Sequence, residues 1–110
     1  MEEHSSNYVK IIVSPTLLKT IIENITDALD NVAKLRTVIG RFEWDAKDKR
    51  RSFLIAQDVQ AVLPEVVEKN PEGNLMLDYT GVIPLLTAAL KEAKTKIDAL
   101  EARIKKLEDG

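Results

Sequence analysis

The sequence predicts an α+β fold, in which a small globule of helices and antiparallel strands is followed by a long C-terminal helix. Two observations lead to this prediction. Short β-branched runs bounded by turn residues alternate with helix-start signals, and an uninterrupted heptad pattern follows them. A chain of 110 residues is one domain by length, and only a modest core remains once the C-terminal helix is set aside.

The heptad pattern occupies the last quarter of the chain. Its a and d positions are Ile83, Leu86, Leu90, Ala93, Ile97, Leu100, Ile104 and Leu107. After Leu90 the apolar stripe narrows to these positions and is flanked by charge, which is typical of a helix that packs against other helices. The g and e positions pair Lys96 with Glu101 and Arg103 with Glu108. These opposite charges favour a parallel homo-oligomer of unspecified helix number, with a monomeric helical tail as the alternative.

The N-terminal part predicts one strand and one helix. Residues 8–13 are β-branched and aromatic, which favours a strand. Ser14 followed by Pro15 is a typical helix start, because the hydroxyl accepts a free backbone amide and proline has none to leave free. Apolar residues then continue at helical spacing to about Arg36, so we expect a helix over 14–36 that Asn24 or Asp27 interrupts.

The middle of the chain predicts two strands, a short helix and a hairpin. Residues 37–44 and 52–55 favour strands, and residues 56–63 favour a helix that ends at Pro64. Residues 65–69 and 74–78 flank a loop that contains Pro71 and Gly73, as expected for a β-hairpin. The long helix is expected to begin at Thr80 or Gly81. We expect Asp58 to lie on the polar surface or to cap locally, with a trimer contact as the alternative. We expect Tyr79 to anchor the start of the long helix through its ring.

Composition excludes several classes of function. The net charge of −2 argues against a nucleic-acid surface and against a basic membrane contact. The chain has no cysteine, and its single His4 lies in a polar start, so we expect no metal, no cofactor and no small-molecule ligand. No apolar run is long enough to cross a membrane, and residues 1–3 lack the features of a signal peptide. We interpret the chain as a piece of a longer protein.

One block of sequence points to a known family. It begins Leu54-Ile55-Ala56-Gln57-Asp58-Val59-Gln60 and continues Ala61-Val62-Leu63-Pro64-Glu65. Gly73-Asn74-Leu75, Leu77-Asp78-Tyr79 and Ile83-Pro84-Leu85-Leu86 follow it and lead into the heptads. From about Ser14 to its end, the chain resembles the C-terminal intramolecular chaperone domains of phage tail spikes and tail fibres, typified by the endosialidase tail spike.

The resemblance implies a function and a site. Such domains form trimers, so the C-terminal helix is expected in a parallel trimeric coiled coil over 82–108. They assist folding of the upstream β-rich fibre of the same polypeptide and then cut themselves off as serine autopeptidases. The implied nucleophile is Ser14, the implied general base is Lys19, and the implied scissile bond is Val13–Ser14. Residues 1–13 would end the fibre segment and residues 14–110 would form the chaperone domain.

The implied setting is a virion tail fibre precursor made in the cytoplasm of the host bacterium, from which the domain is released by cleavage. Two positions depart from the family pattern. Pro15 stands where Asp or Asn usually follows the serine, and Phe53 stands where glycine is common. The alternative function is therefore a cleavage-deficient module for trimerisation and folding. A related domain occurs in membrane-bound eukaryotic transcription-factor precursors, but nothing in this sequence favours that setting.

Overall fold

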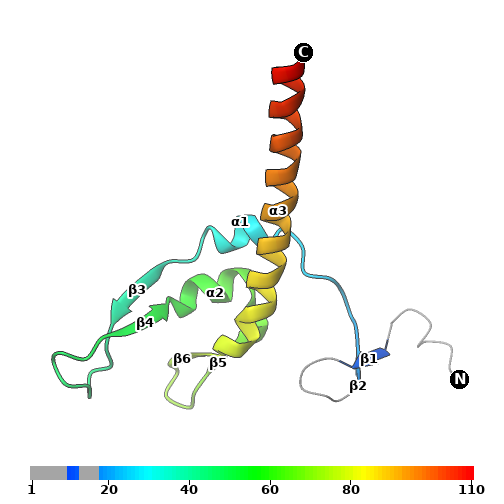
Figure 1. Cartoon of the computed structure of the whole chain (residues 1–110). Coiled ribbons are helices and arrows are strands. Elements are labelled where there is room, and N and C mark those ends of the chain that lie inside the picture. The colour runs from blue at the N-terminus through cyan, green and yellow to red at the C-terminus, as the bar shows by residue number, and fades with distance from the viewer. Residues whose placement is uncertain (1–9, 13–17) are drawn as a thin grey trace, which may run out of the picture.

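The longest element is helix α3 (Tyr79–Asp109), which rises from the rest of the molecule as a rod (Figure 1). The computed structural model describes residues 10–12 and 18–110, with side chains from Thr20 onward. Asp78 caps α3, because its Oδ1 accepts a hydrogen bond of 3.0 Å from the Thr80 amide. The helix thus begins earlier than predicted, and Pro84 lies inside it rather than in its first turn. The Thr80 carbonyl therefore lacks its usual helical donor.

The predicted helix over 14–36 is wrong for much of its length. Leu18–Thr20 forms strand β2, which pairs antiparallel with β1 (Lys10–Ile12), and residues 21–26 have no regular structure. β-Branched residues at 20–22 favour extended backbone. Only Ala28–Val32 is helical, as α1, and Asp27 before it has a left-handed backbone with φ 55°. A helix cannot continue backwards through that conformation, so α1 starts there.

The predicted strands and short helix of the middle region are largely confirmed. β3 (Thr37–Gly40) and β4 (Arg51–Leu54) form an antiparallel hairpin with Val38 opposite Phe53, while residues 41–44 belong to the turn region rather than to the strand. Helix α2 (Ala56–Val62) follows, and a 3₁₀ turn, η2 (Pro64–Val66), comes next. β5 (Val67–Lys69) and β6 (Leu75–Leu77) form the predicted hairpin.

The core is small and lies between the first half of α3 and the elements around it. Its buried hydrophobic residues, within the part of the chain that the structure describes, are Ala28, Val59, Val66, Val82, Leu85 and Ala89. One cluster joins α1 to α3 through Ala28, Leu85 and Ala89. The other joins α2 and η2 to α3 through Val59, Val66 and Val82. The sequence block Leu54–Glu65 thus supplies Val59, one of the buried residues that pack near α3. None of the described helices is long and apolar enough to span a membrane.

Candidate functional site: the exposed seam of α3 and its adjoining groove

The predicted catalytic residues lie at the edge of what the structure describes. Val13 and Ser14 fall outside the described residues. Lys19 lies in strand β2, with its Cα opposite that of Ile11, and not on a helix as predicted. The predicted scissile bond between Val13 and Ser14 likewise lies outside the described residues. The Ser14–Lys19 pair remains a prediction.

The heptad seam of α3 is exposed along its whole length. Its large a and d side chains, Ile83, Leu86, Leu90, Ile97, Leu100, Ile104 and Leu107, all have substantial solvent-exposed area. The buried residues of α3, by contrast, are Val82 and Ala89 at g positions and Leu85 at a c position. The globule therefore packs against the flank of the seam and leaves the seam itself open. A continuous apolar stripe of this length marks an interaction surface.

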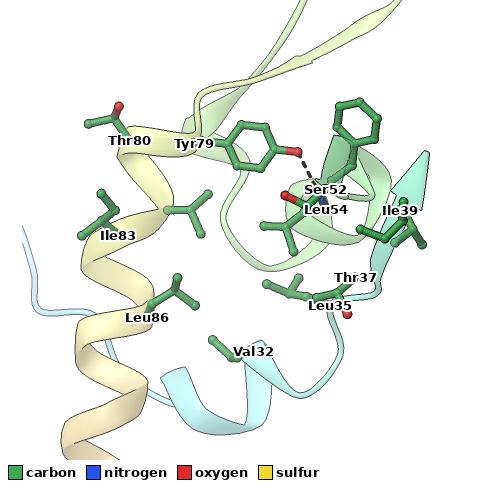
Figure 2. A pocket seen from close by; sticks show the side chains of 13 residues that line it. Val32, Leu35, Thr37, Ile39, Ser52, Leu54, Tyr79, Thr80, Ile83 and Leu86 are labelled. Carbon is green, nitrogen blue, oxygen red and sulfur yellow. Dashed lines mark hydrogen bonds between the residues drawn. The ribbon is translucent and has the colours of Figure 1, made fainter. Parts of the chain in front are cut away.

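An apolar groove adjoins the first two turns of this seam (Figure 2). Its volume is about 700 Å³, and it lies between α3, the β3–β4 hairpin and the end of α1. Its large apolar side chains are Val32, Leu35, Val38, Ile39, Phe53, Leu54, Val82, Ile83 and Leu86. Ile83 and Leu86 belong both to the groove and to the seam. The two surfaces are therefore continuous.

The polar groups of the groove are few and uncharged. Thr37, Ser52, Tyr79 and Thr80 complete its lining. The Tyr79 hydroxyl accepts a hydrogen bond of 3.0 Å from the amide of Leu54 and so ties the start of α3 to strand β4. Tyr79 was expected to anchor the helix through its ring, and the observed tie is made by its hydroxyl. No cluster of three potential metal ligands occurs among the described residues. The lining suits apolar side chains rather than a charged ligand.

Glu92 holds α1 against α3. Its Oε1 accepts a hydrogen bond of 2.8 Å from the Leu29 amide, and its Oε2 accepts one of 3.0 Å from the Ala28 amide. These are amides of the first turn of α1, which lack helical acceptors. The two bonds, that from Leu29 first, lower the pKa of Glu92 because they stabilise the ionised carboxylate. The capping thus couples α1 to the first half of α3.

Two further carboxylates hold the β3–β4 hairpin, which forms one wall of the groove, in place. Asp58 on α2 makes a two-pronged ion pair with Arg36 at 2.8 and 2.9 Å, and the hydrogen bond from the Arg36 side chain lowers the pKa of Asp58. Asp45 in the β3–β4 connection pairs with Arg51 at 2.8 Å, which lowers the pKa of Asp45 to about 2. Phe42 stacks beside this pair, with the Arg51 guanidinium 5.1 Å from its ring centre. These contacts set the hairpin's position and shape.

One known protein family matches part of this chain. Residues 17–68 match the family described as the chaperone of endosialidase, which is classed among peptidase families. The predicted resemblance is confirmed. The chaperone-of-endosialidase match includes β2, α1, the hairpin, α2 and η2, and it ends within β5. It contains Lys19 but begins three residues after Ser14.

Two long tail fibre proteins of phages are similar to this chain. One, long tail fiber protein Gp37 of Escherichia phage AR1, is 52% identical over 52 residues, which are 46% of this chain and 5% of that protein. The other, Gp37 of Salmonella phage S16, is 32% identical over 93 residues, which are 79% of this chain and 12% of that protein. The chain therefore matches a small fraction of the length of these relatives.

Proposed function

We propose that this chain is a trimeric intramolecular chaperone that assists folding and trimerisation of a phage tail fibre and is then released by self-cleavage between Val13 and Ser14. The exposed seam of α3 carries the proposal. A helix with this spacing gains its stability by packing against copies of itself. The chaperone-of-endosialidase match and the two fibre relatives supply the context.

Parallel trimerisation explains how such a module acts on an upstream chain. When three α3 helices pack in register, their three globules lie at the same level along the coiled coil. The three chain segments that precede the globules are thereby aligned as well. Association of the β-rich fibre chains then begins from aligned starting points, which removes much of the entropy cost of bringing them together. The substrate of the chaperone is thus the fibre segment of its own polypeptide, in a virion component made in the host cytoplasm.

The proposed cleavage needs only groups of the chain and one water. The Ser14 Oγ attacks the Val13 carbonyl carbon while the neutral Lys19 amine takes the hydroxyl proton. The C–N bond then breaks, the Ser14 nitrogen leaves as an amine that receives this proton, and the Val13 acyl group is held as an ester on Oγ. Hydrolysis by water yields a Val13 carboxylate and restores the Ser14 hydroxyl. Lysine acts as a base only when neutral, so apolar surroundings that lower its pKa favour the step.

Intact mass spectrometry of fresh protein tests this proposal. The wild-type chain is followed over time at neutral and mildly alkaline pH beside Ser14→Ala and Lys19→Ala. A product that begins at Ser14 in the wild type alone is the expected result. Thr16→Ala and Lys10→Ala are the matched controls, since they remove a nearby hydroxyl and a nearby amine and should leave cleavage intact. Cleavage that persists in Ser14→Ala would contradict the assigned nucleophile.

Pro15 favours a second candidate, a trimerisation and folding module that no longer cleaves itself. Proline removes a backbone amide and a polar side chain beside the proposed nucleophile. This module predicts full-length masses for every variant and under every condition. Pro15→Asp would then be the change expected to restore cleavage. Both candidates predict a trimer in sedimentation, so a monomer would contradict both.

A further inference from the structure

The groove lies on a defined side of the α3 seam. The g residues Val82 and Ala89 are buried by the globule of their own chain. On α3 the groove is lined by Val82 of this buried flank, by the seam residues Ile83 and Leu86, and by Tyr79 and Thr80 at the start of the helix. In a parallel coiled coil the g flank of one helix faces the e flank of the next helix. A neighbouring helix that packs on the seam therefore turns its e flank toward this groove.

The e positions of α3 change character at the level where the groove ends. Thr80 and Thr87, beside the globule, are small and uncharged, whereas the later e positions are Lys94, Glu101 and Glu108. The g positions change in the same way, from Val82 and Ala89 to Lys96 and Arg103. Beyond the globule, the charged e and g positions of neighbouring α3 helices would face each other in the proposed trimer. Beside the groove, the e positions of the neighbouring helix are uncharged, so packing them against the apolar wall buries no charge.

The far wall of the groove is apolar and largely open. Ile39 on β3 is 58% exposed, although the hairpin carrying it is held in place by the Asp58–Arg36 pair and by the Tyr79 hydrogen bond. A rigid apolar wall beside an open seam is well prepared for a partner, since little ordering is needed on binding.

From this placement we infer that the groove receives the first turns of α3 from a neighbouring copy, so that each β3–β4 hairpin clasps its neighbour's helix. The inference rests on the trimer of the proposed function and adds its interlocking contact. The occupant is the Tyr79–Leu90 stretch of the second chain, with Thr87 turned toward Ile39. Assembly then joins each globule to two rods, its own and a neighbour's.

Cross-linking between two distinguishable chains tests the occupant. The chain has no cysteine, so one copy carries only Ile39→Cys and a second, longer-tagged copy carries only Thr87→Cys. After co-expression, a short bis-maleimide is expected to join the two chains within the trimer. The matched control replaces Thr87→Cys with Lys91→Cys, which lies at a b position and points away from the seam. That pair should not cross-link.

The outcomes separate this inference from the proposed function. A trimer without the Ile39–Thr87 link, or with equal linkage to position 91, overturns the clasp and leaves the trimer. Preferential linkage of Ile39→Cys to Ser6→Cys of the same chain would assign the groove to the upstream segment and would also overturn the clasp. A monomer in sedimentation would remove the proposed function itself.

Charge placed on the groove wall gives an equilibrium test. Ile39→Glu is compared with Met76→Glu, because Met76 is similarly exposed at 56% but lies on β6, outside the groove. An unpaired carboxylate buried against a neighbour's helix should weaken assembly about tenfold or more in sedimentation, while Met76→Glu leaves it unchanged. Circular dichroism of each variant verifies that the globule is folded. Equal assembly by the two variants would overturn the clasp.

Discussion

The two halves of α3 share one heptad pattern but have different surroundings. In the first half, Val82, Leu85 and Ala89 are buried by the globule, and Glu92 caps α1. In the second half, every side chain from Lys94 onward is exposed. The a and d residues are alike in both halves, whereas the flanking e and g residues change from uncharged to charged. The residues at the e and g positions, rather than those at the a and d positions, therefore indicate where the globule ends and the rod begins.

This difference separates two sources of stability. The first half is stabilised within its own chain by the two core clusters. The second half has only its helical hydrogen bonds and local pairs such as Lys94–Asp98, at 2.7 Å, and exposed pairs of that kind contribute about 0.3–0.5 kcal/mol. Isolated helices of about 12–15 residues are marginal in water. We therefore expect the rod, unlike the globule, to depend on the partner helices of the proposed trimer.

The largest expected effect follows from a charge on the seam of the rod. Leu100→Asp should dissociate the proposed trimer, because it would bury three carboxylates at one level of the coiled coil. Sedimentation measures the change directly. Ala102→Asp is the matched control, since it adds the same charge at an outward f position two residues away. An unchanged trimer in Leu100→Asp would refute the assignment of the seam as the interface.

Two leucine truncations distinguish the halves. Leu85→Ala should destabilise the globule by about 2–5 kcal/mol, because it leaves a cavity between α1 and α3. Leu90→Ala, on the exposed seam, should instead weaken assembly. Hydrogen exchange distinguishes the two variants. Faster exchange is expected in α1 for Leu85→Ala and along the rod for Leu90→Ala. Identical exchange patterns would mean that the halves form one cooperative unit.

A smaller effect is expected at the close contact between α3 and η2. A Cβ on Gly81 would lie 2.4 Å from Cγ1 of Val66, so Gly81→Ala forces a repacking. Overpacking of this kind costs about 1–3 kcal/mol, which outweighs the helix preference of alanine. Thermal unfolding measures the loss. Val66→Ala in the same chain removes the clashing methyl, so the double variant should lose less than the sum of the two single losses.

The smallest effect is expected at Glu92, and it depends on pH. Its folded pKa is lowered, so its contribution to stability is present above the ordinary glutamate range and is lost as pH falls through the folded value. In the Glu92→Gln variant, the new side-chain NH₂ group would face one backbone amide of α1. This variant should therefore be slightly less stable than the wild type at neutral pH. Chemical denaturation should show this difference vanishing in acid. Glu72→Gln, in an exposed loop, is the control and should show no difference at neutral pH.

Local patterns were sufficient to predict several elements. The long C-terminal helix, the Pro71–Gly73 hairpin loop and the helix ending before Pro64 were all confirmed, because each depends on nearby residues. The helix predicted over 14–36 failed at β2, where the apolar spacing suits a helix but Leu18 pairs with Ile12. Spacing alone does not reveal whether such a partner strand exists.

The candidate site was predicted only in part. The seam follows from sequence, but the groove does not, because its walls come from residues as distant as Val32 and Leu86. Glu92 had no detectable signal either. Its partners are backbone amides 63 and 64 residues earlier, and an amide has no sequence signature. Asp58 was expected to cap or to lie on the surface, and its pairing with Arg36 depends equally on the tertiary fold.

The Glu92 contact also sets the order of events during translation. Ala28 and Leu29 receive their acceptor only after more than 60 further residues have been added. At about 5–20 residues per second, that interval lasts roughly 3–13 s. During this time the nascent globule lacks the contact that fixes α1 to α3. A module placed downstream of its client would therefore become structurally complete only after the client has emerged from the ribosome.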